Sequence, residues 1–201
     1  MGLINTYMKL YQKIVLLAVL LMCTANVKPD VKIVDKGYYR VGYSESLEEP
    51  VWVEYKVMCT ETKFSRKGLD FYPEPGVKTS DNADYAANEW DKGHMAPAAD
   101  FACDSVALRT TFSYVNCALQ QENLNRGVWR YLEARERDLA KTGEVKVKIT
   151  VVFDAASKKL ESGATIPTGF NKTIVHGKTT EKYYFPNTKP KSSNPADYLV
   201  K

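Results

Sequence analysis

Histidine and cysteine are scarce in this chain of 201 residues, which contains two histidines and four cysteines. No two cysteines have the Cys-x-x-Cys spacing of a zinc site, and there is no His-Glu-x-x-His motif. The phosphate-binding loops Gly-x-x-x-x-Gly-Lys-Ser/Thr and Gly-x-Gly-x-x-Gly are also missing. The sequence therefore excludes the common zinc, nucleoside triphosphate and dinucleotide sites, and any chemistry has to come from other residues.

Long apolar runs are missing apart from one near the N-terminus, "IVLLAVLLM" at 14–22. Two lysines and no acid precede this run, and small residues follow it. It is shorter than the roughly 20 residues that a membrane-spanning helix needs. We therefore expect residues 1–25 to be a signal peptide and 26–201 to form one secreted or periplasmic domain, with no stable membrane association after cleavage. A membrane anchor at 14–22 and a lipoprotein signal ending at Cys23 are the alternatives.

Composition adds little about function. A formal net charge of +4 and 44% hydrophobic residues are ordinary for a soluble globular domain, and compatible with an anionic partner without identifying one. Beyond the expected signal peptide three cysteines remain, Cys59, Cys103 and Cys117. An odd number allows at most one internal disulfide and leaves one thiol, and the sequence does not decide the pairing.

Hydrophobic periodicity predicts an α+β fold. Alternating apolar and polar residues predict strands at 51–58 and 144–153. Helical spacing of apolar residues predicts one clear helix from Leu124 to about Ala140, with Gly143 as its stop. Residues rich in Gly, Pro, Asp and Asn predict a long loop at 65–90. Shorter strands are expected near 38–43, 165–175 and 182–185.

The first histidine, His94, lies in the segment "WDKGHMAPAADF" at 90–101. Gly93 before it lets the backbone approach a ligand closely, and Pro97 after it stiffens the chain. A single histidine is more often structural than catalytic, so this segment needs support from a second one.

That support comes from "YVNCALQQENLNRGVWRYLEARERDL" at 114–139, where amide and acidic side chains lie among apolar ones. Asn125 and Glu133 are eight residues apart, which on a helix separates them by about 80° and about 12 Å along the axis. The two side chains therefore cannot both be direct ligands of one ion. One can bind it while the other holds a coordinated water, an arrangement typical of Mg²⁺.

Together these segments resemble the DNA/RNA non-specific endonucleases, the ββα-metal or His-Me finger nucleases. That family has Asp-Arg-Gly-His followed by Ala-Pro, then an Asn before Pro-Gln, then Asn-x-Gly-x-Trp-x-x-Leu-Glu. This chain has Asp-Lys-Gly-His-Met-Ala-Pro at 91–97, Asn116 with Gln120, and Asn-Arg-Gly-Val-Trp-Arg-Tyr-Leu-Glu at 125–133. Weaker similarity extends over about 38–175. The Arg and Pro of the family pattern are replaced by Lys92 and Leu119.

The resemblance implies a central antiparallel sheet flanked by helices, with a ββα-metal active site that hydrolyses DNA and RNA to 5′-phosphate products. His94 would act as the general base, and Mg²⁺, with Mn²⁺ as a substitute, would be the cofactor. The implied catalytic residues are His94, Asn116, Glu133 and Arg66, the metal ligand is Asn125, and the substrate-binding residues are Asp91, Lys92, Gln120 and Arg126.

Two other classes of protein remain open. A catalytically weak or inactive member of the same fold would bind nucleic acid without cutting it, and a structural secreted protein would use the chain only as a scaffold. The intact residues His94, Asn125 and Glu133 favour the enzyme. The resemblance leaves the formation of a homodimer open.

Overall fold

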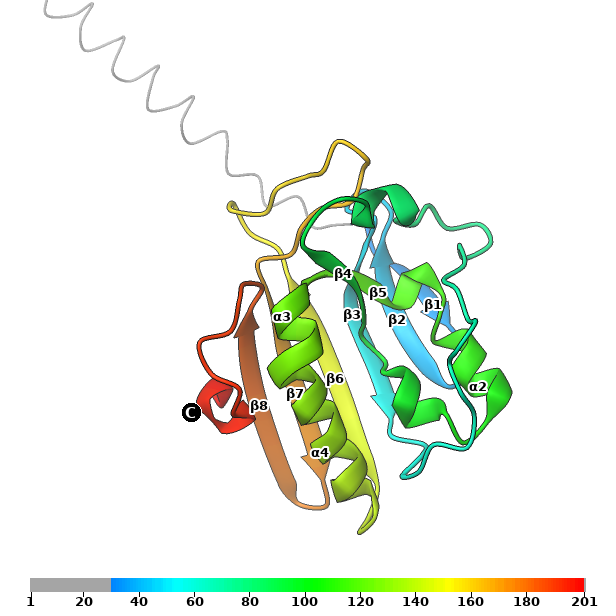
Figure 1. Ribbon diagram of the computed structural model, residues 1–201, viewed down its shortest axis with the longest axis vertical. Helices are drawn as coiled ribbons and strands as arrows, with labels where there is room; N and C mark the ends of the chain where they lie inside the picture. The colour runs from blue at the N-terminus through cyan, green and yellow to red at the C-terminus, as the bar shows by residue number, and fades with distance from the viewer. Residues whose placement is uncertain (1–29, 201) are drawn as a thin grey trace, which may run out of the picture.

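The computed structural model describes residues 30–200, and the expected signal peptide lies outside them. Six antiparallel strands form the main sheet in the order β1-β2-β3-β6-β7-β8, and two further strands form the hairpin β4–β5 (Figure 1). The main strands are β1 (Lys32–Asp35), β2 (Tyr39–Ser44), β3 (Glu49–Lys56), β6 (Val145–Val152), β7 (Gly169–His176) and β8 (Thr179–Pro186). The hairpin consists of β4 (Trp90–His94) and β5 (Cys117–Gln121). The mixed α/β architecture confirms the predicted fold class.

The helices are α2 (Ser105–Thr110), α3 (Glu122–Leu124) and α4 (Arg130–Ala140), with a π-helical turn at Asn125–Trp129 between the last two. Short 3-10 turns lie at Asn82–Tyr85, Ala98–Phe101, Tyr114–Asn116 and Pro195–Tyr198. No helix in the described part of the chain has both the length and the apolar character needed to cross a membrane.

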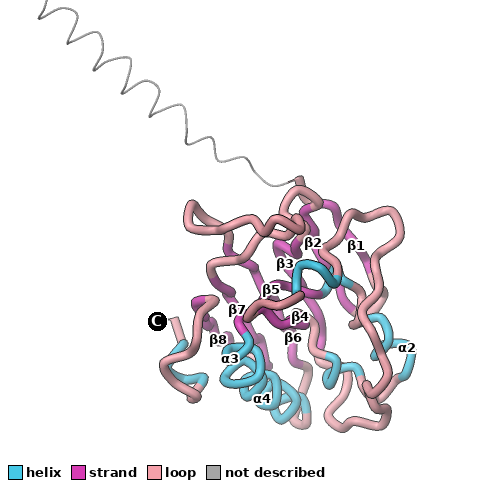
Figure 2. Tube along the Cα trace, turned by 45° about the horizontal axis from the view of Figure 1, so that its top comes forward, coloured by secondary structure: helices cyan, strands magenta, loops and turns pink. Residues whose placement is uncertain are grey.

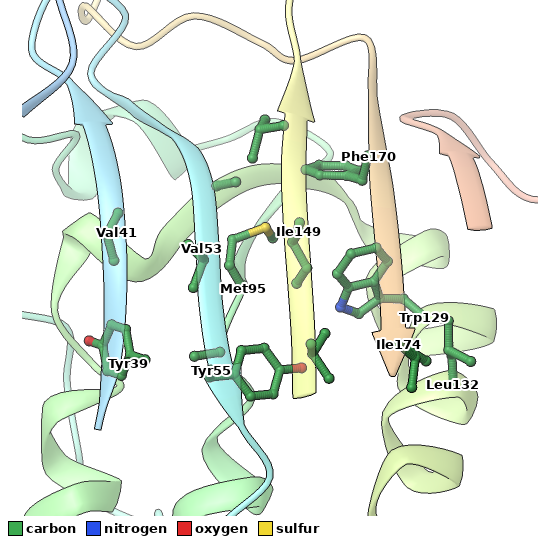
Figure 3. Packing of buried hydrophobic residues seen from close by; sticks show 14 of the residues in the cluster. Tyr39, Val41, Val53, Tyr55, Met95, Trp129, Leu132, Ile149, Phe170 and Ile174 are labelled. Carbon is green, nitrogen blue, oxygen red and sulfur yellow. The ribbon is translucent and has the colours of Figure 1, made fainter. Parts of the chain in front are cut away.

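The alternation in the two long predicted strands is confirmed. Val53 and Tyr55 of β3 and Ile149 of β6 are buried, and the polar residues between them lie on the other face of the sheet. Helix α4 covers the buried face (Figure 1). Trp129, at the start of α4, is fully buried and makes edge-on contacts with Phe170 and Phe185 at centroid distances of 5.4 and 5.5 Å (Figure 3).

The predicted helix is present but not regular. A π-helical turn interrupts it at Asn125–Trp129, where Gly127 has φ −104° and ψ −117°. A π turn accommodates one extra residue, so Asn125 and Glu133 lie closer to the same helix face than the eight-residue spacing of a regular helix predicts. The sequence pattern cannot reveal this turn, because helical periodicity is still visible on both sides of it.

The sequence did not predict β1, β4, β5 or α2. Residues 90–94 of β4, "WDKGH", show no apolar alternation, because this strand carries the polar groups of the cleft described below. Its pairing with β5 places His94 opposite Cys117 and Gly93 opposite Ala118. Gly93 is required there, because a Cβ at this position would lie 2.4 Å from Oε1 of Gln120.

A buried ionic network fixes α4 on the sheet. Lys172 of β7 and Glu136 of α4 are both fully buried, and Nζ of Lys172 donates to Oε1 of Glu136 at 2.7 Å. The hydroxyl of Tyr55 in β3 donates to the other oxygen of Glu136, also at 2.7 Å. The carboxylate therefore ties the helix to two strands that are not neighbours in the sheet.

One disulfide joins Cys59 to Cys103, and Cys117 is buried as a free thiol. This confirms the expectation of at most one internal bridge. The bridge lies where residues 58–64 run beside the segment that comes after β4. There the amides of Met58 and Cys59 donate to the carbonyl of Asp100. It therefore holds the loop at 62–71 next to the residues that follow His94.

We predict that Lys172→Met and Glu136→Gln each lower the free energy of unfolding by about 3–5 kcal/mol, because each leaves a buried group without its ionic partner. The double variant should be more stable than either single variant, since it removes both charges together. Urea denaturation of all three measures this. The exposed pair Lys141–Asp138 is the control, and Lys141→Gln should cost less than about 1 kcal/mol. Additive losses in the double variant would contradict the prediction.

Candidate active site

A cleft of about 970 Å³ lies beside the β4–β5 hairpin. Four parts of the chain line it: the loop at 62–71, β4 with residues 97–102, helix α2 with Phe112 after it, and the helix from Asn125 to Arg137. Figure 2 shows the hairpin β4–β5 close to α3. Of the expected site residues, Arg66, Asp91, Lys92, His94, Asn125, Arg126 and Glu133 line this cleft.

His94 is the last residue of β4, and its ring packs between Phe71 and Phe112 at centroid distances of 4.8 Å each. Within the described residues, no hydrogen bond occupies the ring, and Nε2 is buried without a partner. Burial lowers the pKa of His94 to about 3, and the nearby charge of Arg66 adds to this effect. The imidazole is therefore neutral at pH 7 and has a nitrogen free to accept a proton.

Asp91, two residues before Gly93 on β4, holds the helix against the hairpin. Its Oδ2 accepts hydrogen bonds from Nδ2 of Asn125 at 2.9 Å and from Nε of Arg126 at 2.8 Å. Its Oδ1 accepts another from Nη2 of Arg126 at 2.6 Å. Because the amide nitrogen of Asn125 is used in this way, its oxygen remains available in the cleft.

This arrangement changes the roles expected for Asp91 and Arg126. Both line the cleft, but their charges are paired with each other, and Arg126 also forms an ion pair with Glu122. The contacts therefore indicate that they position Asn125, and they do not support direct substrate binding by either residue.

Glu133 lies on α4, about one turn after Arg130 and about one turn before Glu136 of the buried ionic network. Burial raises its pKa to about 7, and Glu136 contributes in the same direction. Lys172 and Arg137 oppose the shift, and neither forms an ion pair with Glu133. A nearby cation, or a water that donates a hydrogen bond, would stabilise the ionised form of a carboxylate in this setting.

Two cations in the cleft are held differently. Arg66 is in the loop at 62–71, close enough to His94 for its charge to lower the pKa of the imidazole. The ammonium of Lys92 lies 5.4–5.7 Å from the ring centroids of Phe71, Tyr85 and Tyr114 and donates to Oδ1 of Asn82. Lys92 thus has its hydrogen bond to Asn82 and a cage of aromatic rings, which hold it at the side of the cleft.

Asn116 and Gln120, expected as a catalytic and a substrate-binding residue, are fully buried and do not line the cleft. Oδ1 of Asn116 accepts from the amide of Ala96, and its Nδ2 donates to the carbonyls of Ala96 and Thr111. All of its polar atoms thus stabilise the backbone after His94. The amide of Gln120 packs over Gly93 and has no partner among the described residues.

Sequence reasoning missed Asp100, Arg130 and Arg137. Nη1 of Arg137 donates to Oδ1 of Asp100, which is fully buried, at 2.7 Å. Arg130 and Arg137 line the cleft on the same helix face as Glu133. Glu133 and Arg137 follow Arg130 by three and seven residues, which is visible in the sequence as a polar stripe on the helix. A solvated helix surface gives the same pattern.

The residues of the cleft suit a divalent cation that keeps several water ligands better than a cation that side chains surround completely. No group of three His, Cys, Asp or Glu side chains in residues 30–200 could enclose an ion. The amide oxygen of Asn125 is free, and it is the hard, neutral ligand that Mg²⁺ accepts while keeping several of its waters. Glu133 could then hold such a water.

Comparison with known structures identifies the class of fold. EndoG in the crystal structure of the EndoG/EndoGI complex matches with a TM-score of 0.72 and 25% sequence identity, over 84% of this chain and 80% of that chain. The hairpin β4–β5 followed by the helix is the ββα unit of the ββα-metal nuclease fold.

The model of the DNA/RNA non-specific endonuclease family matches residues 22–200, and the chain belongs to this family. Mitochondrial nuclease EXOG of Xenopus laevis is 33% identical over 111 residues, which are 53% of this chain and 31% of that protein. The nuclease of Serratia marcescens is 28% identical over 166 residues, 76% of this chain and 61% of that protein. The chain thus spans about a third of the EXOG relatives that it matches.

We predict that Glu133→Gln stabilises the metal-free protein at pH 8 and not at pH 4.5. The folded-state pKa of about 7 lies above the ordinary value of 4.5, so folding favours the protonated carboxyl, and the wild type loses stability as the pH rises through this window. Glutamine cannot ionise, so the variant should gain about 1–3 kcal/mol at pH 8. Urea denaturation in EDTA at both pH values measures the difference. An equal difference at the two pH values would contradict it.

Proposed function

We propose that this protein is a Mg²⁺-dependent endonuclease that hydrolyses phosphodiester bonds of DNA and RNA and leaves 5′-phosphate ends. The observation that carries the proposal is the position of His94. Its neutral ring has no hydrogen bond within the described residues, and it lines the same cleft as the oriented amide of Asn125. Family membership and the nucleases among the relatives support the same reaction class.

In this proposal a ring nitrogen of His94 takes the proton of the attacking water. A neutral imidazole can do so, whereas a protonated one cannot. A pKa of about 3 makes His94 a weak base. An entering phosphodiester brings a negative charge that offsets the charge of Arg66, and this raises the pKa of His94 towards the range where proton transfer is efficient.

Asn125 is the proposed ligand of the cation, since Asp91 fixes its amide with the oxygen free. When bound, a divalent cation would polarise the phosphate and neutralise the charge on the departing 3′ oxygen. Glu133 would hold water next to it, and the cation would favour the ionised form of this carboxyl. Arg66 would pair with the charge that develops on the phosphate.

The charges of the cleft suit the phosphodiester backbone, which DNA and RNA share. Contacts to phosphates position a nucleic acid without reading its sequence. This supports activity on both nucleic acids without a sequence preference. Dimer formation and export remain predictions from the sequence.

We predict that His94→Ala lowers the rate of plasmid cleavage by roughly 10²–10⁴-fold while the protein stays folded and still binds DNA, because only the proton acceptor is lost. The other histidine gives a matched control: His176 lies at the end of β7 outside the cleft, so His176→Ala should cleave at the wild-type rate. Near-normal cleavage by folded His94→Ala protein would overturn the assignment. A wild type that binds DNA without cutting it, with or without added Mg²⁺, would identify a binding protein instead.

The cation site gives a separate prediction. Asn125→Ala should abolish or greatly weaken Mg²⁺-dependent cleavage, and Glu133→Ala should raise the Mg²⁺ concentration at half-maximal rate, since one residue is the proposed ligand and the other holds water. Asn123→Ala is the control, because Asn123 is exposed on α3 and does not line the cleft. Titration of the cleavage rate with Mg²⁺ measures all three. Wild-type titration curves for both cleft variants would show that the site is wrongly placed.

A further inference from the structure

Arg130 is the first residue of α4, and its side chain is exposed at the cleft. Arg126, Glu133 and Arg137 line the same cleft. Glu133 and Arg137 follow Arg130 at three and seven residues, the spacing of neighbours on one helix face. From Arg126 to Arg137 this face extends roughly 16 Å, at about 1.5 Å per residue. The helix therefore presents three guanidinium groups along one side of the cleft.

The three guanidinium groups differ in their partners. Arg126 is paired with Asp91 and Glu122, and Arg137 is paired with buried Asp100. Arg130 has no ion pair or side-chain hydrogen bond in the part of the chain that the structure describes. Its guanidinium carbon lies 5.5 Å from the ring centroid of Tyr131. Its charge and its hydrogen-bond donors are therefore free for a ligand.

The π-helical turn explains why Arg130 faces the cleft together with Asn125. They are five positions apart in the sequence, which in a regular α-helix would place them about 140° apart around the axis. The turn at Asn125–Trp129 holds one residue more, and both side chains line the cleft. This backbone irregularity places a free cation near the proposed metal ligand.

Arg66 and Arg130 differ in their effect on the proposed proton acceptor. The charge of Arg66 contributes to the lowered pKa of His94, and Arg130 is not among its causes. Its position along the helix, one turn from Asn125, places it beside the reaction centre and not at the base.

We propose that Arg130 binds a phosphate of the nucleic acid next to the one that is hydrolysed. The proposal rests on the proposed nuclease function. A guanidinium fork matches two phosphate oxygens, and an unpaired, exposed arginine can make this contact without first breaking an ion pair. Arg130 thereby anchors the strand and contributes to substrate binding, while Arg66 contributes to the reaction step.

The test separates binding from chemistry. Arg130→Gln should raise KM, and the Kd measured in a His94→Ala background, about tenfold at low salt while leaving kcat within about threefold. The slope of log Kd against log salt concentration should fall by about one, because one phosphate contact is lost. Arg130→Lys should keep most of the slope, since lysine supplies the charge without the fork. Arg66→Gln should instead lower kcat.

The measurements are cleavage of a fluorescent oligonucleotide and fluorescence anisotropy of the same oligonucleotide at several KCl concentrations. Lys141→Gln is the charge-matched control, because it removes one exposed positive charge just beyond α4 and outside the cleft. Wild-type KM and salt slope in Arg130→Gln, or the same change in Lys141→Gln, would overturn the proposal. So would a fall in kcat with unchanged KM. If the wild type does not cleave at all, the proposed function fails, and the anisotropy arm still decides whether Arg130 binds phosphate.

Discussion

The carboxylate of Asp91 is the contact on which the site depends. It accepts one hydrogen bond from Asn125 and two from Arg126, and so joins the strand that carries His94 to the helix that carries the remaining polar groups. In residues 30–200, strand β4 pairs only with β5, outside the main sheet, and side chains help to set its position relative to the helix. Asp91 does this at the point where the helix changes to a π turn.

Titratable groups around the hairpin and the helix fall into two sets with different consequences. Asp91 with Arg126, Asp100 with Arg137 and Glu136 with Lys172 are paired, and they hold the hairpin and the helix in place. His94, Glu133, Arg66 and Arg130 have no such partners within residues 30–200 and line the cleft. Burial of the unpaired His94 and Glu133 costs stability, and the paired set supplies the rigid frame that tolerates this cost.

Two residues illustrate how a shared motif can be held differently. Lys92 replaces the arginine of the family pattern, and its ammonium lies in a cage of aromatic rings with one hydrogen bond to Asn82. A compact ammonium can be accommodated there, whereas a planar guanidinium would need more space and more acceptors. Asn116 keeps its identity, but its polar side-chain atoms bind the backbone after His94, so it supports the segment next to the proposed general base without reaching the cleft.

The sequence by itself determined the elements whose pattern comes from local physics. Strands β3 and β6 follow from alternation, and the helix around Trp129 follows from apolar spacing. Asn125 and Glu133 stand out as polar groups among apolar ones, and the resemblance to the nuclease family singles out His94. Tertiary structure decided which polar groups face the cleft. Asn116 and Gln120 look in the sequence like Asn125 and Glu133, yet they are buried. The pairing of Asp91, the π turn and the free state of Arg130 depend on contacts between segments far apart in the chain, and local periodicity contains no information about such contacts.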